Sequence, residues 1–324
     1  MNIKRRGYEI ARWIFRRLLM IKDYLKGKFW LFIMRISPQT HANHEMKRQN
    51  QQLIRKVDLN NPQYFNEKLL WIKYNIYNHS KVVARCYNKY FVRDYVIKKG
   101  LENILNELYG AWDSIDEVPW NALPEEYVLK ISNGYGGHYI KKKGMETDPK
   151  KIKQQMKLNL SRMKYRVKSV GDLFVYGTKQ KIICERMLHS NWGLSSPEDY
   201  KFHCFHGEPK FVEILWDRFG DSDNAYNSTF VNLGFEDRHE LEGEAHFEKV
   251  EKPSCFDSMI EIARILSNDF PYVRVDLYCE KDKPVFGELT FTPYFKFTST
   301  SLTELGDLIH MEEMEEYKRK LIER

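Results

Sequence analysis

The stretch YVRVDLYCEKDKPVFGELTFTP, residues 272–293, decides the fold of this chain. It predicts two apolar strands joined by a short charged turn. Because successive side chains point to opposite faces of a strand, Arg274 and Asp276 share one face of the first strand. Glu288 and Thr290 likewise share one face of the second strand. A hairpin of the two strands would therefore bring Asp276 opposite Glu288.

The predicted pairing of Asp276 with Glu288 indicates a metal site. Two carboxylates a few ångströms apart are costly unless a cation neutralises them. Hard oxygen ligands favour Mg²⁺, which keeps water and phosphate oxygens as its other ligands. Arg274 beside the two acids suits a phosphate group. The alternative is an exposed hairpin with ordinary surface acids, although both acids lie within apolar strands.

A glycine-rich loop, SNGYGG, follows the predicted strand EYVLKIS at residues 126–132. Its glycines can turn backbone N–H groups toward an anion, and Lys130 lies near the end of the strand. The loop matches neither the P-loop nor the dinucleotide-binding fingerprint. The loop could therefore be a flap over phosphates or an ordinary hairpin turn.

Two further segments carry residues that could contact a nucleotide. Glu185 ends the apolar run of KIICERML, where it could hold a ribose hydroxyl or border an adenine, with Met187 and Leu188 as apolar walls. Asp199 and Lys201 share a strand face by alternation, so the acid could orient the lysine toward a phosphate. The alternative for Glu185 is an acid at a strand end with an ordinary hydrogen-bond partner. The alternative for Asp199 and Lys201 is a cross-strand ion pair.

The composition is that of a folded globular chain. Hydrophobic residues make up 42% of the 324 residues and aromatic residues 14%. The mean hydropathy of −0.60 excludes a polytopic membrane protein, and the length allows two or three lobes around a shared cleft. The five cysteines form no C-x-x-C pair, and no Cys/His group has the spacing of zinc ligands. We therefore predict reduced, mostly structural thiols.

Positive charge is concentrated at the N-terminus. Residues 1–36 hold ten Lys and Arg and only two acids, so the formal net charge of +7 comes from this segment alone. The rest of the chain carries almost equal numbers of basic and acidic residues, which argues against nucleic-acid binding. We recognise no secretory signal pattern and no run long enough to span a bilayer, so we expect a cytoplasmic protein.

Within this segment, residues 8–26 predict an amphipathic basic helix. Its apolar stripe consists of Ile10, Ile14, Leu18, Ile21 and Leu25. Such a helix could lie on an anionic membrane surface, at the inner face of the cytoplasmic membrane, where each nearby Lys or Arg contributes about 1 kcal/mol. Docking on the protein's own domain is the alternative.

Six segments resemble, in this order, the TupA-like ATP-grasp family, which is associated with teichuronopeptide and other bacterial cell-surface polysaccharides. They are NPQYFNEKLLWIK, NKYFVRDYV, LPEEYVLKISNGYGG, KIICERML, PEDYKFHCFHGEPKFVEI and FPYVRVDLYCEKDKPVFGELTFTP. The resemblance covers roughly residues 58–310 and leaves the N-terminal basic helix outside. It implies an α+β ATP-grasp fold, in which two α+β lobes with mainly antiparallel sheets enclose ATP and Mg²⁺.

The resemblance also implies roles for individual residues. Phosphate contacts would come from Lys89 and Lys130, under a closing loop with Ser132, Gly134, Gly136 and Gly137. The adenine hinge would consist of Glu185, Arg186, Met187 and Leu188. Mg²⁺ would be bound by Asp276 and Glu288, with Thr290 where many ATP-grasp enzymes place an asparagine. The transferred phosphoryl group would be stabilised by Arg274 and by Lys201, which Asp199 would orient.

The implied organisation has five segments. They are an amphipathic basic helical segment at 1–36, a connector at 37–57, a helical N-terminal lobe at 58–125, a small lobe with the glycine loop at 126–188, and a C-terminal lobe with the metal site at 189–324.

Two positions depart from the family pattern. The usual Asp-Lys pair is Asn88-Lys89 here, which could weaken the positioning of the lysine. The small residues that commonly follow FTP are replaced by Tyr294-Phe295-Lys296, which could reshape the acceptor side of the cleft. Either change could mark a member with altered or lost activity.

The implied activity is that of an ATP- and Mg²⁺-dependent carboxylate–amine ligase that works through an acyl phosphate. The substrate would be a carboxylate-bearing sugar, such as a uronic acid, or an amino acid, attached to a surface polysaccharide or its precursor. A glycosyltransferase of polysaccharide biosynthesis is one alternative, but the sequence predicts no nucleotide-sugar lobe. A non-catalytic nucleotide-binding scaffold, which would bind ATP without turnover, is the other.

Overall fold

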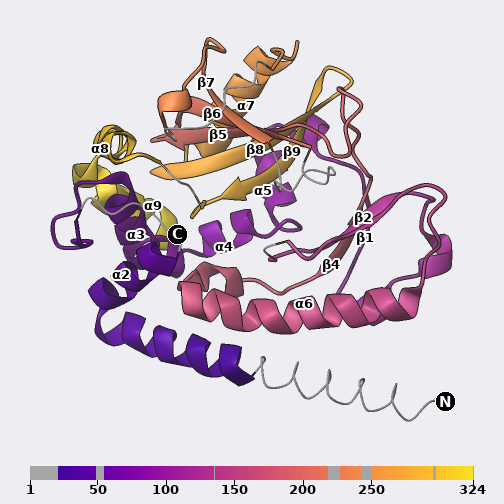
Figure 1. Cartoon of the computed structure of the whole chain (residues 1–324), viewed down its shortest axis with the longest axis horizontal. Coiled ribbons are helices and arrows are strands. Elements are labelled where there is room, and N and C mark those ends of the chain that lie inside the picture. Colours follow the sequence, from indigo (N-terminus) through magenta and orange to yellow (C-terminus); the bar gives the residue numbers. More distant parts are fainter. Residues whose placement is uncertain are drawn as a thin grey trace.

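The computed structural model describes residues 21–48, 55–134, 136–217, 227–241, 250–294 and 297–323. Its strands form two antiparallel sheets, which confirms the predicted α+β class (Figure 1). The smaller sheet has the order β1-β4-β2-β3, with β1 Leu108–Trp112, β2 Tyr127–Ile131, β3 Tyr139–Lys141 and β4 Ile182–Glu185. The larger sheet has the order β7-β6-β5-β8-β9, with β5 Asp199–Phe205, β6 Glu208–Trp216, β7 Asn227–Asn232, β8 Tyr272–Glu280 and β9 Lys283–Thr290.

The larger sheet contains the hairpin predicted for residues 272–293 and a second hairpin, formed by β5 and β6. β5 and β6 turn at His206-Gly207, and β8 and β9 turn at Lys281-Asp282; all four residues have positive φ, as tight twisted hairpin turns require. Helix α7, Phe256–Ser267, packs on β5, β6 and β8 and buries Met259 and Leu266. Because α7 takes one face of the sheet, the alternate side chains of β5 and β8 project from the other face.

The smaller sheet is covered on one face by the long helix α6, Pro149–Val170. Asp148 caps its first turn through the backbone N–H groups of residues 150 and 151, and Gly171 ends it in the left-handed conformation. A common core contains Tyr127, Leu129 and Ile131 of β2 and Ile152 and Met156 of α6. Alternation therefore leaves Val128 and Lys130 of β2 on the opposite face.

The other helices surround the open face of the larger sheet. They are α3 Phe65–Asn75, α4 Lys81–Tyr87, α5 Val92–Lys98, α8 Ser299–Asp307 and α9 Met314–Ile322, with short 3₁₀ helices at Tyr77–His79, Glu102–Ile104, Ile115–Glu117, Trp120–Ala122, Leu173–Tyr176, His239–Leu241 and Met311–Glu313. The ring of Phe65 on α3 packs against Phe205 of β5 and Tyr272 of β8. One end of the open face is thus sealed by aromatic packing.

The segment predicted as a connector, residues 37–57, contains helix α2, Pro38–Arg48. Its buried side is mixed: Ala42 and Met46 pack in a small apolar cluster, and the ring of His41 bonds the Tyr74 hydroxyl at 2.7 Å. With only two apolar residues on the buried side, the helix gives little periodic signal in the sequence.

Strand β1 lies inside residues 58–125, which we predicted as a helical lobe. It pairs with β4 at the edge of the smaller sheet, and all five of its residues are half-buried. A short edge strand without apolar alternation gives little sequence signal. The apolar run of KIICERML, residues 181–188, forms strand β4 and ends at Glu185, and the following residues form the connection between the two sheets.

Residues 21–36 are helical, which agrees with the C-terminal part of the predicted helix 8–26; residues 8–20 lie outside the described residues. The helix docks through Trp30, whose ring stacks on His44 at 3.4 Å between centroids, and through buried Met34. No helix among the residues that the structure describes is long and apolar enough to cross a membrane.

Gly287 lies at a point where strands β8 and β9 approach each other closely. It lies where the register of the hairpin shifts, and a Cβ atom there would be 2.8 Å from the Asp276 carbonyl oxygen and 2.9 Å from the Tyr278 ring. We predict that Gly287→Ala lowers the free energy of unfolding by about 1–3 kcal/mol, the usual cost of overpacking. Urea unfolding measures the change.

Gly234→Ala is the matched control, because its added Cβ would meet only side-chain atoms, the nearest being Asn232 Oδ1 at 3.2 Å. We expect a smaller loss for this variant. Equal stability of the wild type and Gly287→Ala would contradict the close approach of the two strands.

Candidate active site

A row of charged side chains crosses four strands on the open face of the larger sheet. Lys201 of β5 lies directly opposite Glu213 of β6 on one side and opposite Asp276 of β8 on the other. Asp276 in turn lies opposite Glu288 of β9, as the sequence predicts. We call Glu213, Lys201, Asp276 and Glu288 the charged row.

Asp276 is the most heavily bonded member of the charged row. Its Oδ1 accepts a bond from Arg274 Nε at 2.7 Å, and its Oδ2 accepts bonds from Arg274 Nη2 at 2.7 Å and Lys201 Nζ at 2.9 Å. Lys201 also pairs with Asp199 at 2.8 Å, and Asp199, Lys201 and Asp276 are almost fully buried. The structure thus brings four predicted site residues into one buried network.

Glu288 links the charged row to the glycine-rich loop. It pairs with Lys89 at 2.9 Å and accepts a 3.3 Å bond from the Thr290 hydroxyl. Lys89 Nζ also donates to the carbonyl oxygen of Gly134 at 3.2 Å, and the Lys89 backbone N–H donates to Ser132. The predicted phosphate lysine, metal acid and flap therefore meet at one point.

Two members of this network, Arg274 and Glu288, are held in the ionised state by their charged neighbours. Burial opposes the charge of Arg274, but Asp276 beside it raises the pKa of Arg274 above its ordinary value. Burial likewise opposes the charge of Glu288, but Lys89, with Lys201, lowers the pKa of Glu288 well below its ordinary value. Arg274 and Glu288 therefore stay charged at neutral pH.

A pocket of about 380 Å³ lies beside the charged row, between the two sheets. Its walls include Val128 and Lys130 of β2, Met187 and Leu188 of the connection after β4, and Tyr278 of β8. A pocket of this size, with apolar walls and a few polar groups, suits a small ligand such as a nucleoside. Tyr278 joins the two parts of the site, since it lies on the same strand as Asp276.

Of the predicted hinge residues, Arg186, Met187 and Leu188 line this pocket and Glu185 does not. Glu185 and Arg186 are held by partners of their own. Glu185 pairs with Lys130 at 2.6 Å. Arg186 pairs with Glu280 at 2.7 Å, and its carbonyl oxygen accepts a 2.9 Å bond from Asn106. These contacts fix the path of the chain where it passes from one sheet to the other.

The loop residues differ in their surroundings. Ser132 is fully buried, and its hydroxyl accepts the backbone N–H of Lys181 at 2.9 Å, so it anchors the loop to the scaffold. Gly136 and Gly137 have φ of +65° and +72°, a conformation that favours glycine. Gly134 packs against Met163 of α6, which leaves no space for a larger residue without a shift.

Asn88, the first departure from the family pattern, is a buried structural residue. Its Oδ1 accepts the backbone N–H of Tyr90 at 3.0 Å, and its Nδ2 donates to the Thr178 hydroxyl at 2.9 Å. An amide meets both demands, whereas a carboxylate has no N–H to donate. Of the second departure, Tyr294 is 49% exposed, and residues 295–296 lie outside the described residues.

The donor set around Asp276 and Glu288 fits Mg²⁺. Two carboxylates and the Thr290 hydroxyl offer only hard oxygen atoms, and Mg²⁺ is usually held by one or two carboxylates together with phosphate oxygens. The ammonium group of Lys89 now neutralises Glu288, so a bound divalent cation would compete with it. Asp276 and Glu288 would hold the ion, which would supply positive charge to phosphate oxygens.

Sequence reasoning missed Glu213 as a member of the network. Glu213 lies 3.8 Å from Arg274 and 4.0 Å from His203, and these neighbours lower its pKa although burial acts against its charge. Counting outward from the turn at His206-Gly207 would have placed Val212 opposite Lys201, and a register shift between His203 and Cys204 brings Glu213 there instead. The local hairpin pattern therefore could not reveal Glu213.

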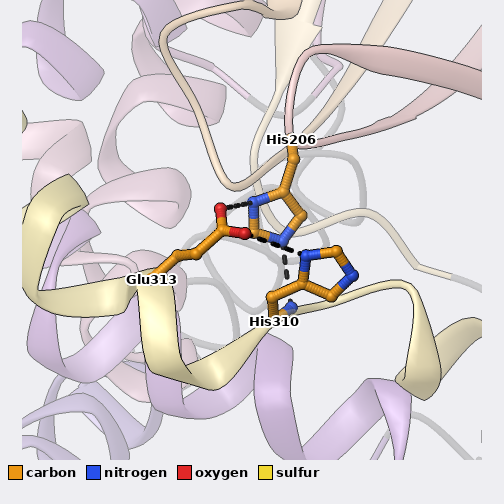
Figure 2. A group of neighbouring side chains, drawn as sticks. All are labelled: His206, His310 and Glu313. Atoms are coloured by element: carbon orange, nitrogen blue, oxygen red, sulfur yellow. Dashed lines mark hydrogen bonds and ion pairs between the residues drawn. The ribbon is translucent and has the colours of Figure 1, made fainter.

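A second cluster of charged side chains lies at the other end of β5 (Figure 2). Glu313 bonds the Nδ1 atoms of both His206 and His310 at 3.0 Å, and the ligand atoms of all three residues lie within 4.8 Å of one another. However, the backbone N–H of His310 donates to His206 Nε2 at 3.0 Å, which places the ring proton of neutral His206 on Nδ1. The cluster is thus complete as a hydrogen-bonded tether between the β5–β6 turn and the C-terminal segment.

A model of one protein family matches most of the chain, over residues 67–310, and its description is TupA-like ATPgrasp. The chain belongs to the TupA-like ATP-grasp family. The matched range contains every member of the charged row and the pocket beside it. No curated protein matches the chain.

Solved structures of ATP-grasp ligases show a weak overall likeness. D-alanine–D-alanine ligase from Bacillus anthracis is 14% identical, with 78% of this chain and 75% of that chain covered at a TM-score of 0.45. The ATP-grasp ligase PsnB, complexed with minimal precursor, Mg and ADP, is 10% identical, with 76% of this chain and 65% of that chain covered at a TM-score of 0.40. D-alanine–D-alanine ligase from Helicobacter pylori is 12% identical, with 76% of this chain and 66% of that chain covered at a TM-score of 0.39.

The depressed pKa of Glu288 predicts a pH-dependent contribution to stability. A carboxyl whose pKa is lower in the folded state stabilises the fold above its unfolded pKa of about 4.5 and loses that contribution as pH falls toward the folded value. We predict that Glu288→Gln lowers stability at pH 7 by no more than about 1 kcal/mol, because solvent screens this partly exposed pair. The difference from the wild type should be constant above that unfolded pKa and should shrink below it.

Urea unfolding of both proteins as a function of pH makes this comparison. Glu208→Gln is the control, since Glu208 lies on the same sheet but its side chain is 52% exposed. A difference between wild type and Glu288→Gln that grows on acidification would contradict the assigned charge state.

Proposed function

We propose that this protein is an ATP- and Mg²⁺-dependent carboxylate–amine ligase that works through an acyl phosphate. The observation that carries the proposal is the pairing of Asp276 with Glu288 beside Lys89, Lys201 and Arg274, at the edge of the pocket lined by Lys130. This combination offers oxygen ligands for a divalent cation and four cationic side chains for phosphate groups. Its position inside an ATP-grasp family match supports ATP as the source of the phosphoryl group.

In the proposed reaction, a substrate carboxylate oxygen attacks the γ-phosphorus of ATP, and ADP leaves. Lys89 and Lys130 would hold the phosphates, while Arg274 and Lys201 would stabilise the charge on the transferred group. An amine then attacks the acyl carbon, phosphate leaves, and the nitrogen loses a proton to solvent. The residues named here bind and orient, and the chemistry needs no protein nucleophile.

The substrate would be a uronic-acid sugar or an amino acid that becomes linked to a cell-surface polysaccharide or its precursor. The resemblance to a family associated with teichuronopeptide supports this choice. ATP supply would place the reaction in the cytoplasm. The exposed side chain of Tyr294, directly after the metal-site hairpin, would lie toward the acceptor side of the site.

The first test is ADP formation by the purified protein with Mg²⁺, alone and with pooled uronic acids and amino acids. We expect turnover that requires a carboxylate, and a loss of about 100-fold or more in Asp276→Asn and in Glu288→Gln, the scale of removing one group that stabilises transition-state charge. Asp257→Asn, an 81% exposed acid on α7, is the control and should retain activity. Nucleotide binding without turnover under every condition would favour a scaffold and contradict the ligase.

Lys130 provides a separate test of the nucleotide pocket. Removing its ammonium group takes away a phosphate partner and leaves Glu185 facing the bound anion. We predict that Lys130→Ala raises the Kd of ATP by about tenfold, which corresponds to about 1.4 kcal/mol. Isothermal titration calorimetry measures the Kd of ATP. The control is Lys210→Ala, at an exposed lysine of β6. Unchanged ATP affinity in Lys130→Ala would place the phosphates elsewhere.

A further inference from the structure

The helix at residues 21–36 carries a row of exposed apolar side chains. The row consists of Ile21, Leu25, Phe29, Phe32 and Ile36, each 54–62% exposed. At 3.6 residues per turn these five positions fall within an arc of about 80°. We call them the apolar stripe. Exposed large apolar groups usually occur singly, whereas a contiguous set marks an interaction surface.

The apolar stripe is not the face through which this helix packs on the protein. The packed face contains Trp30, stacked on His44, together with buried Gly27 and Met34. These residues lie on the side of the helix opposite the stripe. In Figure 1 the helix runs along the lower edge of the molecule, outside the layers of the two sheets. The body therefore holds the helix in place, and the stripe faces away from it.

Cationic side chains border the apolar stripe on both sides. Lys22 and Lys26 lie on one side, and Lys28 and Arg35 lie on the other, about 60–100° from its centre. All four are exposed. Basic residues at the edges of an apolar face are typical of helices that lie in a membrane interface, where the apolar groups enter the acyl boundary and the cations meet anionic headgroups.

We propose that the apolar stripe inserts into the surface of a lipid bilayer with anionic headgroups, with the helix lying in the plane of the membrane. The charge pattern favours a bilayer over a second copy of the chain, because two stripes packed together would also bring their basic borders together. The sequence extends the same spacing through Leu18, Ile14 and Ile10. The site for ATP lies on other elements, so membrane binding does not depend on turnover.

Co-sedimentation with vesicles tests this proposal on the full chain. The wild type should bind vesicles of phosphatidylcholine with phosphatidylglycerol far better than vesicles of phosphatidylcholine alone, and salt should weaken binding. Phe29→Ser with Phe32→Ser should lower the partition coefficient at least about tenfold. Replacing Lys22, Lys26, Lys28 and Arg35 together by Gln should lower binding to the anionic vesicles by a similar factor.

Ile97→Ser with Ile265→Ser is the matched control, since both residues are exposed isoleucines on other helices, and it should bind like the wild type. Thermal unfolding of every variant checks that the body remains folded. Equal binding to both kinds of vesicle, no binding, or binding unchanged by Phe29→Ser with Phe32→Ser would overturn the proposal. The proposal would also be overturned if the wild type forms a dimer and does not bind vesicles, and if Phe29→Ser with Phe32→Ser dissociates that dimer. The stripe would then be a self-association surface.

Discussion

The buried charged row is the interaction on which the rest of this structure depends. Placing Lys201 and Asp276 out of contact with water costs several kcal/mol per ion, and only close partners offset that cost. Lys201 and Asp276 therefore need each other across neighbouring strands. A slip of one residue in β8 would turn Arg274 and Asp276 together toward α7 and leave Lys201 without Asp276. The register of four strands is thus fixed by electrostatics as well as by apolar packing.

The charged row also sets the geometry of the proposed active site. It ends at Glu288, on the edge strand, where Lys89 connects the larger sheet to the loop at Gly134. The pocket whose walls come from both sheets meets the larger sheet at Tyr278, two residues from Asp276 on β8. A ligand that brings phosphate groups and a divalent cation would offer Lys89 and Glu288 new partners of opposite charge. The contact between loop and sheet would then depend on what occupies the site.

Local patterns predicted much of this arrangement. Strand alternation with two tight turns placed Asp276 opposite Glu288 and Lys201 beside Asp199, because hairpin register depends on near neighbours in the chain. The pairing of Lys89 with Glu288 joins residues far apart in sequence, so no local pattern could reveal it. Helix α2 was missed because its buried side has only two apolar residues, Ala42 and Met46. Strand β1 was missed because edge strands need little apolar alternation.

The central claim is that Asp276 and Glu288 hold a divalent cation against the phosphates of ATP. The most direct measurement is a crystal structure of the protein with Mg²⁺ and a non-hydrolysable ATP analogue. The account predicts Mg²⁺ bound by both carboxylates, adenine between Met187 and Tyr278, and Lys89 moved from Glu288 to a phosphate. A nucleotide bound elsewhere, or a Lys89–Glu288 pair that is intact with the analogue in the pocket, would contradict it.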